Sequence, residues 1–153
     1  MTYIFLCLHL LSVAVWVGGM FFAYVALRPA AAKMLEAPER LNLWSATFAR
    51  FFLWVWIAVA LILLSGFGMI STGGGFKNSP LYVNAMMAAG LVMMAIFAHV
   101  YFAPYQRLVR YVAAREWKAA GEQLAQIRKM VGLNLALGLL TITVATVGHL
   151  FAV

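Results

Sequence analysis

The sequence predicts an all-α protein, a transmembrane antiparallel four-helix bundle, and three observations support this fold class. Hydrophobic residues make up 66% of the 153 residues and charged residues only 10%, whereas soluble domains carry roughly 25% charged residues. Four apolar runs, at approximately 3–27, 50–71, 81–103 and 131–152, are each long enough for the about 20 helical residues that cross a bilayer. Mostly short connections favour antiparallel neighbours. We therefore expect one integral membrane domain over residues 1–153, surrounded by the lipid bilayer.

The first apolar run is expected to be a retained transmembrane helix rather than a cleaved signal peptide. Residues 1–27 contain no lysine or arginine, whereas a signal peptide has a basic segment before a short apolar core of about 7–15 residues. The run is followed by RPAAAKMLEAPER, in which Pro29 and Pro38 are each placed to begin a short helical piece. Glycines within the spans, among them Gly18 and Gly19, are expected to let helix backbones approach closely.

The other two breaks between apolar runs differ in kind. The second, STGGGFKNSP, is rich in glycine and ends in Pro80, which is typical of a loop. The third, PYQRLVRYVAAREWKAAGEQLAQIRK, has apolar residues at roughly helical spacing among its charges, from Leu108 to Ile127. We expect this segment to extend the third and fourth helices beyond the membrane or to lie along the membrane surface.

The distribution of basic residues predicts the orientation of the bundle. Ten of the 11 lysines and arginines lie in or beside the first and third connections, and the remaining one is Lys77 in the second. By the positive-inside rule, the first and third connections are cytoplasmic. Both termini are then periplasmic, in a multi-pass protein of a bacterial inner membrane. Topology also accounts for the net charge of +7, so no nucleic-acid partner is expected.

Ionisable residues inside the spans are the first candidates for a functional site, because their burial in lipid is costly. They are His9, His99 and His149, and no aspartate, glutamate, lysine or arginine lies well inside a span. This absence argues against a carboxylate-based proton pump or a channel built on acidic rings. Helical phase places His9 on one face with Ser12 and Trp16, and this face is expected to look into the bundle.

Matching faces are expected to look inward on the other three spans. They consist of Trp54, Ala58, Leu61, Ser65 and Gly68 on the second, Asn84, Ala88, Val92, Ala95 and His99 on the third, and Asn134, Gly138, Ile142, Thr146 and His149 on the fourth. At about 1.5 Å per residue, His9 and His149 lie at similar depths near the outer surface, whereas His99 lies near the cytoplasmic side. His9 and His149 are therefore predicted to meet across adjacent helices.

The first functional hypothesis is a b-type haem held by these histidines. Two neutral imidazoles from facing helices suit the axial positions of a haem iron. His9 would be one ligand and His149 the other, with Trp16 on the same face as His9. His99, with Arg107 nearby, would serve a second site or the propionates. The protein would transfer electrons or act on a porphyrin-like substrate, and as an enzyme it would be a membrane oxidoreductase. In the simplest alternative, each histidine only hydrogen-bonds a neighbouring helix.

Copper is the alternative cofactor. Thioethers are soft ligands that select Cu(I), and four methionines recur at a spacing of seven on the third span: Met86, Met87, Met93 and Met94. Cys7 and His9 would add ligands at the outer mouth, although two residues apart on a helix they point in different directions. A methionine stripe at helical spacing is also typical of ordinary packing.

A third hypothesis is a non-catalytic membrane subunit that packs against a larger complex through its apolar faces. The sequence leaves open whether a protein partner is a second copy of the chain or a membrane redox protein. All three hypotheses share one fold, so they differ only in what the bundle binds.

Three segments resemble helices of the copper-resistance protein D family: LHLLSVAVWVGGMFFAYVALRPAA, FFLWVWIAVALILLSGFGMI and SPLYVNAMMAAGLVMMAIFAHVYFAPYQRLVR. The most specific parts are His9 with the WVGG that follows it, Ser65-Gly66, and the histidine late in the third span. The resemblance implies copper handling at the bacterial inner membrane. The family is also similar to the HemJ-type protoporphyrinogen oxidase, a four-helix b-type haem protein. There, a first-helix histidine corresponds to His9, and a required lysine corresponds to Asn84, which would neither ligate iron well nor carry charge.

Overall fold

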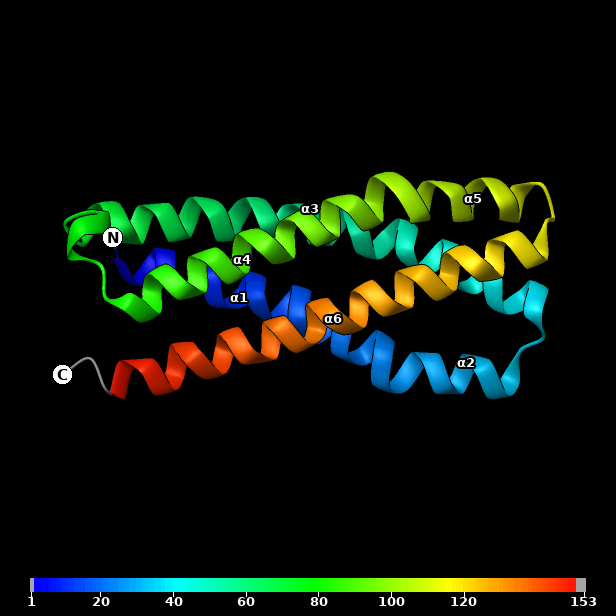
Figure 1. Cartoon of the computed structure of the whole chain (residues 1–153), viewed down its shortest axis with the longest axis horizontal. Coiled ribbons are helices and arrows are strands. Elements are labelled where there is room, and N and C mark those ends of the chain that lie inside the picture. The colour runs from blue at the N-terminus through cyan, green and yellow to red at the C-terminus, as the bar shows by residue number, and fades with distance from the viewer. Residues whose placement is uncertain (1, 151–153) are drawn as a thin grey trace.

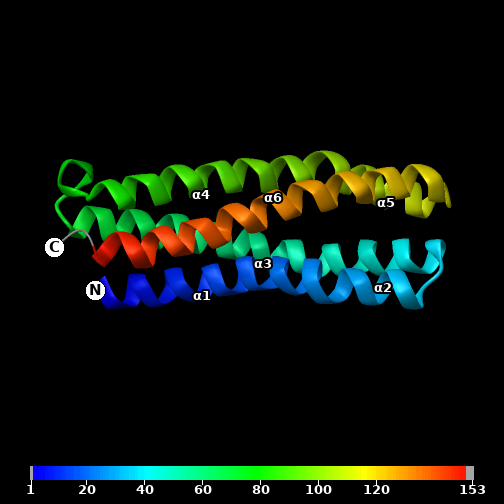
Figure 2. The same cartoon turned by 60° about the horizontal axis from the view of Figure 1, so that its bottom comes forward.

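The computed structural model describes residues 2–150, apart from the side chains at positions 2, 78, 149 and 150. Residues 2–150 contain helices and short connections but no strand. Four helical segments are long and apolar enough to cross a membrane: Tyr3–Met34, Ala37–Thr72, Leu81–Ala113 and Trp117–Gly148. They alternate in direction, so residues 2 and 150, the two ends of the described chain, lie at one end of the bundle (Figures 1 and 2). The predicted all-α transmembrane four-helix bundle is confirmed.

We call the end with residues 2 and 150 the terminal end. The opposite end, which holds the connections at residues 35–36 and 114–116, is called the basic end. Ten of the 11 lysines and arginines lie within residues 28–50 and 107–129, which contain these two connections and the helix ends on either side of them.

The first segment is a continuous helix made of three parts. α1 (Thr2–Phe21) runs into a π-helical stretch, η1 (Phe22–Leu27), and then into α2 (Arg28–Met34). Pro29 stands in the first turn of α2. In a regular α-helix its ring would clash with the carbonyl four residues earlier, and the wider π turn before it relieves this clash. Pro29 therefore begins a short piece as predicted, but this piece continues the first span without a break.

The second segment begins at the predicted proline and ends at the predicted loop. α3 (Ala37–Thr72) has Pro38 in its first turn and a capping box, in which Glu39 Oε2 accepts the N–H of Glu36 at 3.2 Å. The helix that Pro38 begins is the whole second span rather than a short piece. The loop after it contains a 3₁₀ turn, η2 (Phe76–Asn78), and Gly74 and Gly75 adopt φ of 94° and 82°, which favour glycine.

The third and fourth segments extend beyond their apolar runs. α4 (Leu81–Val100), the π-helical η3 (Tyr101–Tyr105) and α5 (Gln106–Ala113) form one continuous helix, with Pro104 inside the π stretch. α6 (Trp117–Leu150) follows after a turn of three residues. The expectation that the third break extends the two helices is confirmed. Positions 151–152 of the last predicted span lie outside the described residues.

The four segments form two helical hairpins. α1 packs mainly on α3, and α4 mainly on α6. α1 and α6 also touch near mid-length, where a Cβ added to Gly138 would lie 3.0 Å from Val17 Cγ2. Figure 1 shows α1 and α6 crossing near this level and then diverging toward the terminal end.

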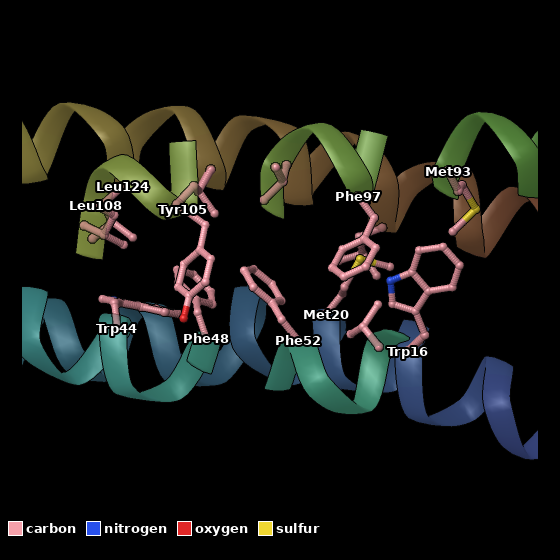
Figure 3. Packing of buried hydrophobic residues seen from close by; sticks show 14 of the residues in the cluster. Trp16, Met20, Trp44, Phe48, Phe52, Met93, Phe97, Tyr105, Leu108 and Leu124 are labelled. Atoms are coloured by element: carbon pink, nitrogen blue, oxygen red, sulfur yellow. The ribbon is translucent and has the colours of Figure 1, made fainter. Parts of the chain in front are cut away.

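The hydrophobic core fills the middle and the basic end of the bundle. Figure 3 shows its aromatic centre, in which Phe48 and Phe52 stack with ring centroids 5.0 Å apart and Tyr105 meets Phe52 edge-on at 4.9 Å. The terminal end is different, because no described side chain in residues 3–11, 66–92 or 139–148 is buried. The outermost turns of the helices, roughly 10–18 Å at 1.5 Å per residue, therefore enclose no core.

Candidate functional site

His9 lies in the seam between α1 and α3, close to the terminal end. Its Nδ1 is 3.0 Å from Oγ of Ser65, which is only 1% exposed. Gly66 lies beside the ring, since a Cβ at that position would be in ordinary van der Waals contact, 3.7 Å from the imidazole Cε1. His9 and Ser65-Gly66, two of the sequence features that carry the family resemblance, are thus in contact with each other.

The hydrogen bonds around Ser65 favour one tautomer of His9. The Ser65 hydroxyl has the carbonyls of Leu61 and Ile62, within its own helix, as acceptors for its single proton. With that proton on a carbonyl, the Ser65 oxygen accepts from the imidazole, and the His9 proton is then on Nδ1. Nε2 consequently carries the free lone pair of the ring. A neutral imidazole with this proton arrangement is the form that ligates a metal.

Helical phase predicted the inward face of α1 correctly and those of the other helices in part. Ser12 and Trp16 are buried and His9 is half-buried. Two further predicted positions on α3 and two on α6 are also buried: Ala58, Ser65, Asn134 and Gly138. The prediction is wrong for three exposed side chains: Trp54, Ile142 and Thr146.

The predicted inward face of the third span is also wrong. His99 and Ala95 are exposed, and Val92 is 52% exposed. α4 instead buries a stripe of bulkier apolar side chains: Met93, Phe97 and Val100. Burying this stripe fills more of the core than burying the face with His99 would, and it leaves the imidazole outside the apolar interior. The helix is therefore rotated so that the bulky apolar side chains face inward.

Among the described side chains, the other residues predicted to hold the haem make no recorded contact with His9. Arg107 is exposed on α5, and Asn84 is half-buried in the first turn of α4. The side chain of His149 lies outside the described residues, so its pairing with His9 stays a prediction.

The polar partners that the structure gives His9 are Ser65 and the backbone of Ile62, both on α3. The signal for the contact between His9 and Ser65 was available, because both residues lie about seven positions from the terminal ends of their helices.

A small cavity lies at the centre of the bundle, deeper than His9. It has a volume of about 20 Å³ and is lined mainly by aromatic and aliphatic side chains, including Trp16, which meets Phe97 edge-on at 6.1 Å. Asn134 is its polar member: Nδ2 donates to the carbonyl of Met93 at 3.1 Å, and Oδ1 has no partner among the described residues. The volume suits about one water molecule. A porphyrin therefore does not fit inside the core.

The candidate copper ligands do not converge. Met93 is buried, and a Cβ at Gly138 would lie 3.1 Å from its Cε, so Met93 packs between α4 and α6. The other three stripe methionines are half-buried: Met86, Met87 and Met94. Cys7 is exposed. In the part of the chain that the structure describes, no three His, Cys, Asp or Glu side chains are grouped to hold a metal.

Comparison with known proteins identifies a family. No curated protein and no solved structure matches the chain. The family model for Copper resistance protein D matches residues 45–147, roughly two thirds of the chain, from within α3 to the last turns of α6. α1, with His9, precedes the matched residues. On this match and its four apolar helices, the chain is a multi-pass membrane protein that belongs to the Copper resistance protein D family.

Proposed function

We propose that this chain is a membrane electron-transfer protein that binds a b-type haem through His9. The observation that carries the proposal is the hydrogen bond between His9 Nδ1 and Ser65 Oγ. Metal-ligating histidines almost always donate their other ring N–H to an oxygen acceptor, which fixes the tautomer and the ring orientation. Ser65 would have this role, and Nε2 would be the iron ligand.

The position of His9 along the bundle supports the same proposal. The central cavity of about 20 Å³ is too small for a porphyrin, whereas His9 lies near the terminal end, where no described side chain in residues 3–11, 66–92 or 139–148 is buried. The haem would be held in this region, with His149 as the predicted second ligand, and it would supply one-electron chemistry. The chain would orient the ligand and surround the ring with apolar side chains.

The test is the visible spectrum of the detergent-purified protein, oxidised and then reduced with dithionite, with metal analysis of the same sample. We expect sharp reduced-state bands and close to one iron per haem site. A folded protein that stays colourless and iron-free after expression with ample haem would contradict the proposal.

Copper handling is the second candidate, and family membership favours it. His9, Cys7 and the methionines of α4 would act as separate soft sites rather than as one cluster. Copper without colour in the purified protein would support this candidate. Unchanged copper tolerance and cellular copper after deletion of the gene would contradict it.

We further propose that the basic end is cytoplasmic and the terminal end periplasmic, in a bacterial inner membrane, because basic connections are retained inside. In a Cys7→Ser background, Lys77→Cys and Lys118→Cys each place one exposed cysteine at an opposite end of the bundle. A membrane-impermeant maleimide is expected to label Lys77→Cys on spheroplasts, and Lys118→Cys only after permeabilisation. The reverse pattern would invert the topology.

A further inference from the structure

Three arginines from three helices gather at the basic end of the bundle. Arg28 begins α2, Arg40 lies in the first turns of α3, Arg128 lies in α6, and all three are half-buried. Arg128 lies one helical turn before Gly132 on α6, and its charge is influenced by those of the other two arginines. Tyr24 joins the helices beneath them: the Arg28 Cζ lies 4.9 Å from its ring centroid, and a Cβ added to Gly132 of α6 would lie 3.0 Å from its ring.

The cluster has no acidic partner among the described residues. The groups that act on the charge of Arg128 are the other two arginines and a tyrosine, and no carboxylate is among them. The acids closest in sequence to Arg40 are Glu36 and Glu39, and both cap the start of α3. Arg40 itself donates to a neutral group, the carbonyl of Leu35. Because like charges held together repel, a bound anion would stabilise the arrangement.

If the hydrocarbon core begins at the terminal ends of the helices, the cluster lies at about the depth of the lipid phosphates on the opposite side. Arg28 and Arg128 are about 26 and 22 residues from the terminal ends of their helices, or about 39 and 33 Å at 1.5 Å per residue. The hydrocarbon core of a bilayer is about 30 Å thick, so both side chains begin just beyond it. Arg40 lies farther out, on the headgroup side.

We propose that Arg28, Arg40 and Arg128 bind the phosphate group of an anionic phospholipid. Guanidinium groups bind phosphate through paired, charge-assisted hydrogen bonds, and basic pockets between transmembrane helices suit such headgroups. The contact with Tyr24 holds Arg28 toward the site. Exposed apolar side chains on the membrane side, such as Phe22 and Leu133, would contact the acyl chains. This site is independent of the proposed haem.

The test measures thermal unfolding of the full chain in mixed micelles. We expect phosphatidylglycerol to raise Tm more than phosphatidylcholine does. The variant Arg28→Gln/Arg40→Gln/Arg128→Gln is expected to bind phosphatidylglycerol roughly tenfold to a hundredfold more weakly. The matched control removes three exposed positive charges from the same half of the bundle, by Arg110→Gln/Lys118→Gln/Lys129→Gln, and is expected to keep the rise in Tm.

The other outcomes of this experiment distinguish a lipid site from a free-phosphate site and from no site. An equal rise with inorganic phosphate alone would make free phosphate the ligand and overturn the lipid assignment. A rise retained by the cluster variant, or lost equally in the matched control, would overturn the site. If the glutamine variant does not fold, replacing the three arginines with lysine keeps the charge but removes the paired hydrogen bonds. Unchanged affinity in that lysine variant would overturn the assignment of paired guanidinium hydrogen bonds to the phosphate.

Discussion

The His9→Ala variant is expected to lose the reduced-state haem bands and the bound iron of the purified protein. His9 is the ionisable side chain held in the α1–α3 seam, and its Nε2 is the nitrogen that Ser65 leaves for iron. Removing His9 removes one of the two predicted protein–iron bonds, the one whose orientation Ser65 fixes. The measurement is the dithionite-reduced spectrum and the iron content, at equal amounts of folded protein.

Three further variants sharpen this result. His99→Ala is the matched control, since His99 is exposed on α4, and it is expected to keep the bands. Ser65→Ala is expected to bind haem with lower affinity, because loss of a hydrogen-bond partner that orients a metal ligand typically costs 10–100-fold in metal affinity. His149→Ala tests the predicted second ligand and is expected to change the spectrum. Bands that survive in His9→Ala, or that disappear equally in His99→Ala, would contradict the role of His9.

Gly18→Leu and Gly19→Leu are expected to differ sharply in stability although the two glycines are adjacent. A Cβ at Gly19 would overlap the ring of Phe51, which packs beside Phe52 with centroids 6.3 Å apart. Overpacking of this kind typically costs about 1–3 kcal/mol. Gly18 is exposed and has nothing within 4 Å of an added Cβ, so leucine there replaces a poor helix former with a good one.

Thermal unfolding in detergent measures this difference, with wild type as the reference. Gly19→Leu is expected to unfold at a lower temperature than Gly18→Leu, which should match or exceed wild type. Equal losses in both variants would show that α1 does not pack on α3 as described. The expectation that both glycines serve close packing is corrected here, because only Gly19 faces a neighbour.

The presence of the four helices could be predicted from the sequence, whereas the residues at which the helices end could not. The apolar runs marked the four helices because only a helix satisfies its backbone in lipid. The helices run farther at the basic end, through Pro29 and Pro104, because π turns accommodate each proline within the helix. Proline alone predicts a start or a break, and the π turn that absorbs it has no simple sequence signal.

The candidate site divides in the same way. The sequence alone determined that His9 faces inward near one end, since helical phase and depth follow from position along a single helix. Only the tertiary structure decided three other features. His9 contacts Ser65, His99 faces outward, and Arg128 lies close to Arg28 and Arg40. Each depends on how one helix is rotated and placed against another. That choice comes from packing bulky side chains such as Met93 and Phe97 into one core, so no single helix carries it.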